Sequence, residues 1–492
     1  MIETHLSVLQ IILPLIGAPL CALVRRGTAA YLIAVAASWL AFAVSCALLG
    51  QVQANGPISY ELGGWAPPWG IEYRIDFLNA YVLLIVAAIG AVVITFARPS
   101  VRQEMGPHRE FLFYSVYLLC LTGLLGVTIT GDAFNIFVFL EISSLSSYIL
   151  IGLGRDRRAL TAAYRYLIFG TIGATFFLIG VGLIYAATGT LNIADMAQRI
   201  ALIGDSRTVR AALAFIVVGL LIKSAVFPLH FWLPNAYTYA PSVSTAFLAA
   251  TATKVSIYVL VRMVFTLFGT ELAFTNILID KLLVATAIAA MFVGSTVAIF
   301  QTDVKRMLAY SSVAQIGYMI VGIGMVSVLG VTGGLLHMFN HALIKGALFL
   351  ALGCVAYRTG SVSLDAMAGL GRRMPWTMGA FVVAGLGLIG VPLTAGFVSK
   401  WYLILAALER DWWWLAVLIV LSSLLAVIYV WRVIEIAYFR PAPADAPTGE
   451  APLPMLAVTW GLTLASVYFG VHTDISVGVA SDAASFLLGA AR

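Results

Sequence analysis

The segment GGLLHMFNHALIKGALFL at residues 333–350 is almost wholly apolar, yet it carries His337, His341 and Lys345 at intervals of four. At 3.6 residues per turn, this spacing places the three polar side chains on one face of a helix. The surrounding apolar run, residues 331–357, is long enough to cross the hydrocarbon core of a bilayer. The segment therefore predicts a membrane-spanning helix with a titratable stripe.

Metal binding is the first alternative for two histidines that lie four residues apart. The HExxH pattern of zinc proteases needs a glutamate after the first histidine, where this chain has Met338, and no third ligand lies nearby in the sequence. The four cysteines form no CxxC pair, and no phosphate-binding glycine motif is present. We therefore expect no metal and no cofactor in this chain, so any redox or ATP chemistry must happen elsewhere.

The whole composition extends the membrane interpretation beyond this helix. Hydrophobic residues make up 62% of the 492 residues and charged residues only 10%, with a mean hydropathy of +1.00. A soluble domain carries about 25% charged residues, so lipid must be the solvent here. We predict an all-α integral membrane protein with about fourteen transmembrane helices. The expected spans are 6–24, 29–49, 77–97, 111–130, 132–153, 162–187, 209–232, 241–268, 281–301, 307–328, 331–357, 378–407, 412–438 and 452–470.

Two of these spans contain helix breakers. Pro228 and Pro234 interrupt the seventh span, and Gly390 and Pro392 interrupt the twelfth. Broken helices in corresponding positions of two halves are typical of transporters built from repeats, and the spacing of five spans predicts two inverted five-helix repeats. The expected domains are an N-terminal three-helix unit, a first repeat, a second repeat, and a C-terminal helix with a tail that lies at the surface. Their expected ranges are 1–110, 111–270, 271–440 and 441–492.

The distribution of lysine and arginine over the connections predicts the orientation. The odd-numbered connections carry fifteen of these residues and the even-numbered ones seven, although the even-numbered connection at 188–208 is mixed in charge. Cytoplasmic loops are enriched in lysine and arginine, so the odd connections are expected in the cytoplasm. With fourteen spans, both termini then face outward.

A few charges remain inside the predicted spans, where each is expected to be unfavourable by several kcal/mol unless paired or hydrated. One deep acid, Glu141, lies near the midplane. Four of the six lysines are internal, whereas the twenty-two arginines lie almost entirely in connections. A buried lysine can lose its proton near neutral pH and arginine cannot, so we predict reversible proton carriage in place of static ion pairs or snorkelling. The five internal bases are Arg165, Lys223, Lys254, Lys345 and Lys400.

Several long motifs resemble one known family, the antiporter-like subunits of respiratory complex I, membrane-bound hydrogenases and Mrp-type cation/proton antiporters. The resemblance covers roughly 110–405, and the stretch GGWAPPWGIEYRID at 63–76 is most similar to the D-type subunits of the Mrp branch. The other motifs are FNIFVFLEISSLSSYILIG, LIKSAVFPLHFWLPNAY, APSVSTAFLAATATKVSIYVLVR, TDVKRMLAYSSVAQIGYM and HMFNHALIKGALF.

The resemblance implies a function as well as a fold. It implies a proton-translocating subunit of a multisubunit Na+/H+ antiporter in the bacterial inner membrane, with further membrane subunits as partners. The alternative is a proton-pumping subunit of a complex I-type NADH:quinone oxidoreductase or membrane-bound hydrogenase; a purely structural scaffold fits the internal charges poorly. The implied relay residues are Glu141, Lys223, Lys254, His337, His341, Lys345 and Lys400, with His230 as a possible access residue.

Overall fold

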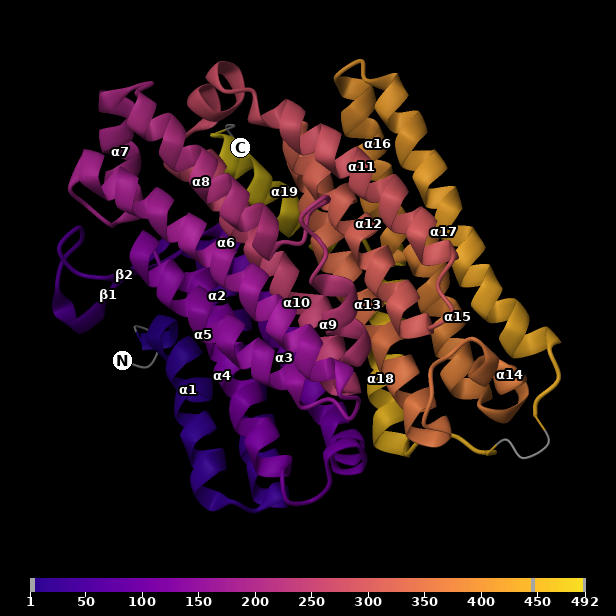
Figure 1. Ribbon diagram of the computed structural model, residues 1–492. Helices are drawn as coiled ribbons and strands as arrows, with labels where there is room; N and C mark the ends of the chain where they lie inside the picture. Colours follow the sequence, from indigo (N-terminus) through magenta and orange to yellow (C-terminus); the bar gives the residue numbers. More distant parts are fainter. Residues whose placement is uncertain (1–4, 444–446, 490–492) are drawn as a thin grey trace.

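The computed structural model of the chain describes residues 5–443 and 447–489. Helices dominate it and run side by side, tilted in a common direction, as one broad bundle (Figure 1). The chain crosses this bundle from the N-terminal helices on one side to the helices of residues 375–439 on the other, and its last two helices return to the middle (Figure 1). Nearly all helices are apolar around their whole circumference, as expected of helices surrounded by protein and lipid.

The N-terminal unit contains three long helices and a small hairpin. Its elements are α1 (Leu6–Val24), α2 (Gly27–Asn55), β1 (Ile58–Glu61), the 3-10 turn η2 (Leu62–Gly64), β2 (Glu72–Ile75) and α3 (Phe77–Met105). β1 and β2 pair antiparallel, with Ile58 opposite Ile75. Asp76 then caps α3, because its carboxylate accepts hydrogen bonds from the backbone N–H groups of Leu78 and Asn79.

The next segment forms a first bundle that includes one interrupted helix. Its elements are α4 (Glu110–Ile129), α5 (Ala133–Gly152), α6 (Arg158–Thr188), α7 (Ile193–Ile203), α8 (Arg207–Lys223), α9 (Leu233–Tyr239), α10 (Ser242–Val261) and two π-helical turns, η3 (Arg262–Leu267) and η4 (Glu271–Asn276).

A second bundle repeats this plan and is followed by two C-terminal helices. Its elements are α11 (Ile279–Ile299), α12 (Val304–Gly324), α13 (Val328–Thr359), η5 (Asp365–Met367), α14 (Leu370–Arg373), α15 (Pro375–Ile389), α16 (Ala395–Glu409) and α17 (Trp413–Phe439). The C-terminal helices are α18 (Leu453–Val471) and α19 (Asp474–Leu488). The expected surface tail is thus a helix, and α19 packs across α3 and α13 through small side chains such as Ala480 and Ala483.

Matching short bridges mark the internal repeat. Asp132, which caps α5, pairs in an antiparallel bridge with Asn192, and Asp303, which caps α12, pairs likewise with Ser363. Each bridge joins the start of a bundle's second helix to the segment after its third helix. The first bridge adjoins α7 and the second lies just before η5 and α14, at opposite ends of the molecule (Figure 1). Opposite ends are what two inverted repeats require.

The number of spans agrees with the sequence prediction. Among the described residues, twelve helices are long and apolar enough to cross a membrane. The α8–α9 and α15–α16 pairs supply two more crossings, each broken near its middle at the predicted prolines and glycines. The all-α membrane fold with broken seventh and twelfth spans is therefore confirmed, whereas the domain limits at 110, 270 and 440 remain predictions.

Candidate functional site

The break in the seventh span brings polar backbone into the bundle interior. α8 ends at Lys223, and helical geometry resumes only at Leu233 in α9. The backbone N–H groups of Ser224 and Val226 bond the last carbonyls of α8, and the Trp232 indole N–H donates to the Ile222 carbonyl at 2.9 Å. These bonds satisfy groups that would otherwise be unpaired at the helix end. The break is thereby stabilised and holds Lys223 at the end of its helix.

Lys223 forms an ion pair with Glu141, the one deep acid of the predicted spans. Its Nζ lies 3.1 Å from Glu141 Oε1 and donates to the Ser144 hydroxyl at 2.6 Å. Glu141 and Ser144 are three residues apart on α5, so one helix face supplies both partners. The Lys223 side chain is 3% exposed and that of Glu141 is 24% exposed. The acid therefore faces the outside of the bundle in part, while the base faces inward.

Lys254 lies alone at the centre of the molecule. It is fully buried on α10, and its Nζ donates to the backbone carbonyl of Ala249. None of the ion pairs among the described residues includes it. The structure thus buries this amine with a neutral backbone carbonyl as its hydrogen-bond partner.

The predicted polar stripe lies on α13 and all three of its members are buried. His337 has both ring nitrogens engaged, Nδ1 with the Ser399 hydroxyl at 2.9 Å and Nε2 with Gln315 Oε1 at 2.8 Å. His341 stacks beside it at 6.2 Å, and neither of its ring nitrogens has a hydrogen-bond partner among the described residues.

Lys345 ends the α13 stripe and binds neutral oxygens only. It donates to the Leu308 carbonyl at 2.7 Å and to the Ser311 hydroxyl, both on α12. These contacts orient the amine without giving it an opposite charge. The stripe thus combines one fixed histidine, one histidine free to accept a new partner, and one lysine held by neutral oxygens.

The break in the twelfth span is capped by a lysine. α15 ends at Ile389, and Lys400 on α16 reaches back so that its Nζ donates to the carbonyls of Leu388 at 3.1 Å and Ile389 at 2.7 Å. The Ser423 hydroxyl accepts a third bond at 2.6 Å. The carboxyl end of a helix carries partial negative charge, which favours an ammonium there. Gly390, with φ 91°, leaves room for this side chain, since a Cβ would lie 2.9 Å from Lys400 Cδ.

The lysine-bearing helices pack against one another in order. α8 packs against α10, α10 against α13, and α13 against α16. The structure therefore arranges Lys223, Lys254, the α13 stripe and Lys400 on four successively packed elements, each side chain buried. This arrangement makes the four elements a candidate line for lateral proton transfer.

The other residues singled out in the sequence lie at the margin of this line. His230 is buried in the α8–α9 break between Phe227 and Phe231, and its Nδ1 has no partner among the described residues. Arg165 is exposed on α6, outside the line. In the described part of the chain, no group of three or more His, Cys, Asp or Glu side chains could hold a metal ion.

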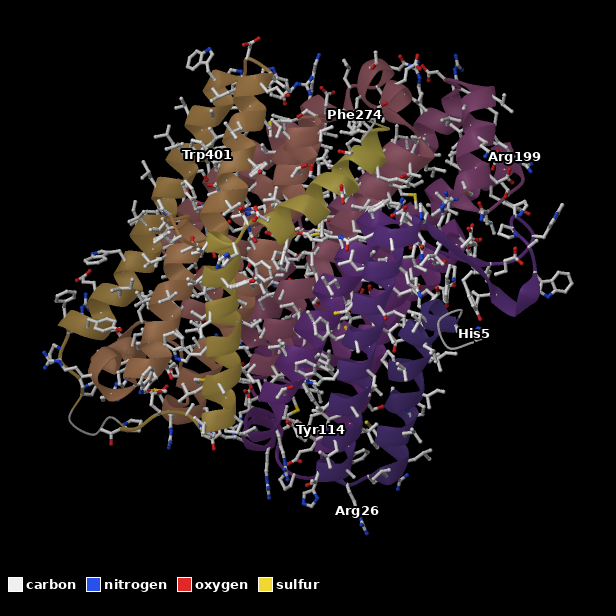
Figure 2. The ribbon with its side chains drawn as sticks, turned by 180° about the vertical axis from the view of Figure 1, so that it is seen from behind. His5, Arg26, Tyr114, Arg199, Phe274 and Trp401 are labelled. Atoms are coloured by element: carbon white, nitrogen blue, oxygen red, sulfur yellow. The ribbon has the colours of Figure 1, made fainter. Side chains whose placement is uncertain are left out.

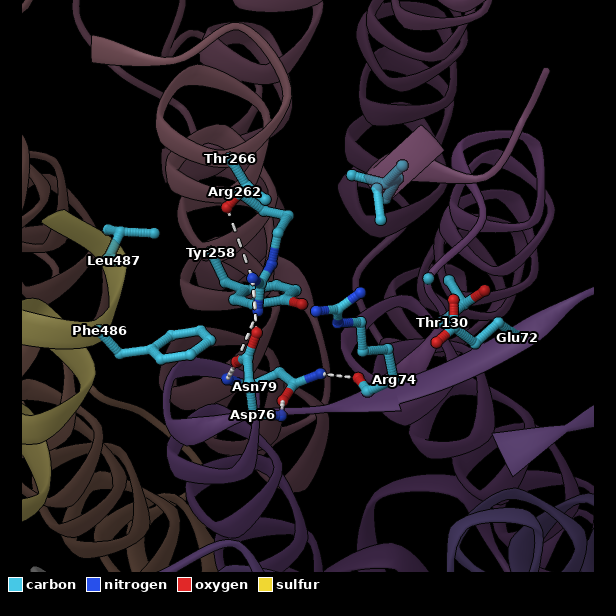
Figure 3. A pocket seen from close by; sticks show the side chains of 13 residues that line it. Glu72, Arg74, Asp76, Asn79, Thr130, Tyr258, Arg262, Thr266, Phe486 and Leu487 are labelled. Carbon is cyan, nitrogen blue, oxygen red and sulfur yellow. Dashed lines mark hydrogen bonds and ion pairs between the residues drawn. The ribbon is translucent and has the colours of Figure 1, made fainter. Parts of the chain in front are cut away.

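A second buried ion pair was missed by the sequence analysis, which did not count Arg262 among the internal bases. The Arg262 guanidinium binds both Asp76 oxygens, at 2.7 and 2.8 Å, and joins the start of α3 to η3 (Figure 3). Burial alone would raise the pKa of the Asp76 carboxyl, but Arg262 and the cap N–H groups hold that pKa below its usual value. Hydropathy gave no signal for it, because both residues lie at span ends.

Lys305 is also buried, although the sequence placed it in a connection. Its Nζ donates to the Ala240 carbonyl, which follows α9. It lines a polar cavity of about 330 Å3 together with Glu104, Asp303 and Arg155. Burial is the first cause that raises the pKa of the neighbouring Asp303 carboxyl above its usual value. This cavity brings ionisable groups toward the bundle interior from one end.

Comparison with known proteins shows what this arrangement resembles. The family model described as NADH:quinone oxidoreductase/Mrp antiporter, transmembrane region, matches residues 130–426. A relative from Desulforudis audaxviator, named as the N subunit of an NADH-quinone oxidoreductase, is 45% identical, over 96% of this chain and 95% of its own length. A relative from Alkalihalophilus pseudofirmus, named as the D-type subunit of a Na(+)/H(+) antiporter, is 33% identical, over 80% and 79%.

A solved structure extends the likeness over the whole fold. A chain of the Mrp complex from Dietzia sp. superimposes with a TM-score of 0.92 at 26% identity, covering 100% of this chain and 99% of that one. The agreement includes the N-terminal unit and the C-terminal helices, which lie outside the part matched by the family model.

Proposed function

This chain belongs to the NADH:quinone oxidoreductase/Mrp antiporter family of membrane subunits, and from that membership we propose that it is the proton-translocating subunit of a multisubunit Na+/H+ antiporter. The observation that carries the proposal is the Glu141–Lys223 ion pair at the broken seventh span, continued by three further buried lysines. The chain itself supplies proton-carrying groups, and its partners are the other membrane subunits of the complex.

The relay begins with the ion pair in this proposal. While Glu141 is close, its charge favours the protonated form of Lys223; when the pair opens, the buried ammonium loses that support and releases its proton inward. Lys254 and the α13 stripe receive protons in turn, and Lys400 delivers them at the second break. Because the Glu141 side chain is 24% exposed, a neighbouring subunit can reach it and so control the pair.

Location and orientation follow from the same proposal. We place the chain in the bacterial inner membrane, with the odd-numbered connections in the cytoplasm and both termini outward, on the excess of lysine and arginine in those connections. In this proposal Na+ passes through a partner subunit or along the surface between that subunit and this chain. The buried line in this chain is built from lysines and histidines, which repel cations when protonated.

A redox-driven pump is the second candidate function. It is favoured by the relative from an NADH-quinone oxidoreductase, which is more similar in sequence than the antiporter relative reported above. In that case the same line of residues would carry protons, and the driving reaction would take place in other subunits of the complex.

Everted membrane vesicles that contain the full complex distinguish the two functions. In an antiporter, adding Na+ to vesicles with an established pH gradient should dissipate that gradient, and Glu141→Gln should abolish the effect. The exposed Glu271 provides a matched control, because Glu271→Gln removes a carboxylate of η4, an element outside the line. A proton gradient produced by NADH oxidation, with no response to Na+, would instead identify the redox pump. Unchanged Na+ response in Glu141→Gln would refute the relay itself.

A further inference from the structure

A long apolar crevice opens on the outer face of the bundle. It has a volume of about 640 Å3 and lies between α2, α3, α13, α18 and α19. Figure 2 shows this side of the molecule, with the C-terminal helices α18 and α19 in yellow across the face. Aromatic and aliphatic side chains make up most of its lining, and Ala88, Ala342 and Gly461 leave space because their side chains are small or absent. A Cβ built on Gly461 meets nothing within 4 Å, so the space beside it is open.

One end of the crevice continues into a basic pocket. Thr95 lines both spaces, and the second pocket, of about 550 Å3, is also lined by Arg98, Arg102 and Tyr31. Arg98 donates to the Thr28 hydroxyl at 2.9 Å, and none of the ion pairs among the described residues includes it. Among the described residues Arg102 forms one ion pair, a long one with Glu110 at 3.7 Å, and its side chain is 65% exposed. Two positively charged side chains therefore lie at one end of the apolar crevice.

We propose that this composite site binds one anionic phospholipid of the surrounding bilayer, with its phosphate at Arg98 and Arg102 and its acyl chains in the crevice. Guanidinium groups bind phosphate through paired hydrogen bonds, and basic pockets between membrane helices suit anionic lipid head groups. Arg98 follows the apolar part of α3, near the carboxyl end of that helix. The two arginines therefore lie at the level of the lipid phosphates, and the crevice lies at the level of the acyl chains.

The dimensions of the crevice agree with an acyl chain of one leaflet. Its lining residues on α3 run from Tyr81 to Thr95. At 1.5 Å per residue this is roughly 21 Å, about two thirds of the ~30 Å hydrocarbon core, which is enough for one extended acyl chain and too short to cross the core. A transmembrane helix of a partner subunit would need the full core thickness and would gain nothing from the two arginines.

The lipid would also support the helix that carries the polar stripe. Phe339, Ala342 and Leu343 line the crevice from α13, next in sequence to the buried His341. An ordered acyl chain at this position fills the space behind the stripe and restricts movement of α13. The lipid is thus a structural ligand of the proposed relay helix, and it touches none of the relay side chains.

Native mass spectrometry of the detergent-purified complex tests the proposal with added phosphatidylglycerol and phosphatidylcholine. The parent should retain phosphatidylglycerol in preference to phosphatidylcholine. Arg98→Gln should lower phosphatidylglycerol retention about fivefold, the effect expected for one basic side chain near a lipid phosphate. Gly461→Trp should fill the crevice and reduce retention of both lipids.

Matched controls separate these effects from general damage. Arg26→Gln removes an exposed arginine from the α1–α2 connection, and Gly182→Trp adds an indole at an α6 glycine that also has open space around it. Both should behave as the parent does. Equal retention of the two lipids by the parent, full retention in Gly461→Trp, or a crevice covered by a helix of another subunit in the complex would each overturn the proposal.

Discussion

At the scale of single residues, the choice of lysine over arginine carries the functional meaning. Lys223, Lys254, Lys345 and Lys400 are all buried, and of these four only Lys223 has a carboxylate partner among the described residues. A positively charged side chain needed only for its charge could as well be arginine. The use of lysine at all four places agrees with groups that must also exist without their proton.

Lys254→Arg tests this directly. Arginine is intrinsically more basic than lysine by about three pKa units, so deprotonation becomes on the order of a thousandfold less favourable. We expect cation-driven proton transport in vesicles to fall at least tenfold, with normal assembly of the complex. Lys281→Arg is the matched control, because Lys281 is exposed on α11 and should tolerate the change. Parent activity in Lys254→Arg would mean that this position supplies fixed charge only.

The histidines illustrate what residue patterns can and cannot predict. The spacing of His337 and His341 correctly placed both on one helix face, but it does not indicate their hydrogen-bond partners. In the structure His337 is fixed by Ser399 and Gln315, whereas His341 has no partner among the described residues. Ser399 and Gln315 come from other helices, α16 and α12, so their contribution depends on tertiary packing that no local pattern reports.

At the scale of elements, proline and glycine predicted the two breaks but not how they are stabilised. Both breaks have local backbone bonds, but the first is closed by the neutral Trp232 indole, whereas the second is closed by the Lys400 amine and by the Ser423 hydroxyl from α17. The two repeats are therefore alike in backbone plan and different in chemistry. The hydrophobic pattern predicts the backbone plan, because that plan depends on burying apolar side chains. The groups that cap each break depend on which side chains reach the helix end in the folded chain.

The Asp76–Arg262 pair joins α3 to the helix that carries Lys254 and should matter for stability. Asp76→Asn leaves the buried guanidinium without a counter-charge, which is expected to destabilise the fold by about 3–5 kcal/mol. The measurement is the thermal unfolding temperature of the purified complex. Asp205→Asn breaks an exposed pair with Arg210 and should change little. If both variants unfold at the parent temperature, the pair does not hold these elements together.

The same pair should be insensitive to acid over the working range. Because the pKa of Asp76 is lowered in the folded protein, its stabilising contribution is present above the unfolded pKa of about 3.9 and is lost only as the pH falls through the lower folded value. Any change in transport between pH 5 and 8 must therefore come from other groups.

At the scale of the whole molecule, the sequence predicts the number and order of the helices better than it predicts which charged residues are buried or where crevices lie. Fourteen crossings and both interruptions follow from apolar run length and helix breakers alone. The buried positions of Lys305 and Arg262 do not, because a charged residue at a span end gives the same pattern whether it meets solvent or a neighbouring helix. The lipid-sized crevice is likewise invisible in the sequence, since its walls come from five helices.

The proposed orientation is tested at this scale. Leu202, 88% exposed, lies in the connection at 188–208 that is expected outside, and Arg26 lies in one expected in the cytoplasm. The two ends of the molecule that carry Arg199 and Arg26 are opposite in Figure 2. In a Cys46→Ala background, Leu202→Cys should react with a membrane-impermeant maleimide on intact cells and Arg26→Cys only after lysis. The reverse labelling pattern would show that the chain has the opposite orientation in the membrane.

The Asp76–Arg262 pair also has a consequence for how the chain is made. Its two members are 186 residues apart, so α3 leaves the ribosome long before η3 does. At about 5–20 residues per second, the acid waits roughly ten to forty seconds for its partner. During that interval the Asp76–Arg262 contact cannot form, although α1 to α4 can already pack against one another. The attachment of α3 to η3 is therefore completed only after synthesis has passed the middle of the chain.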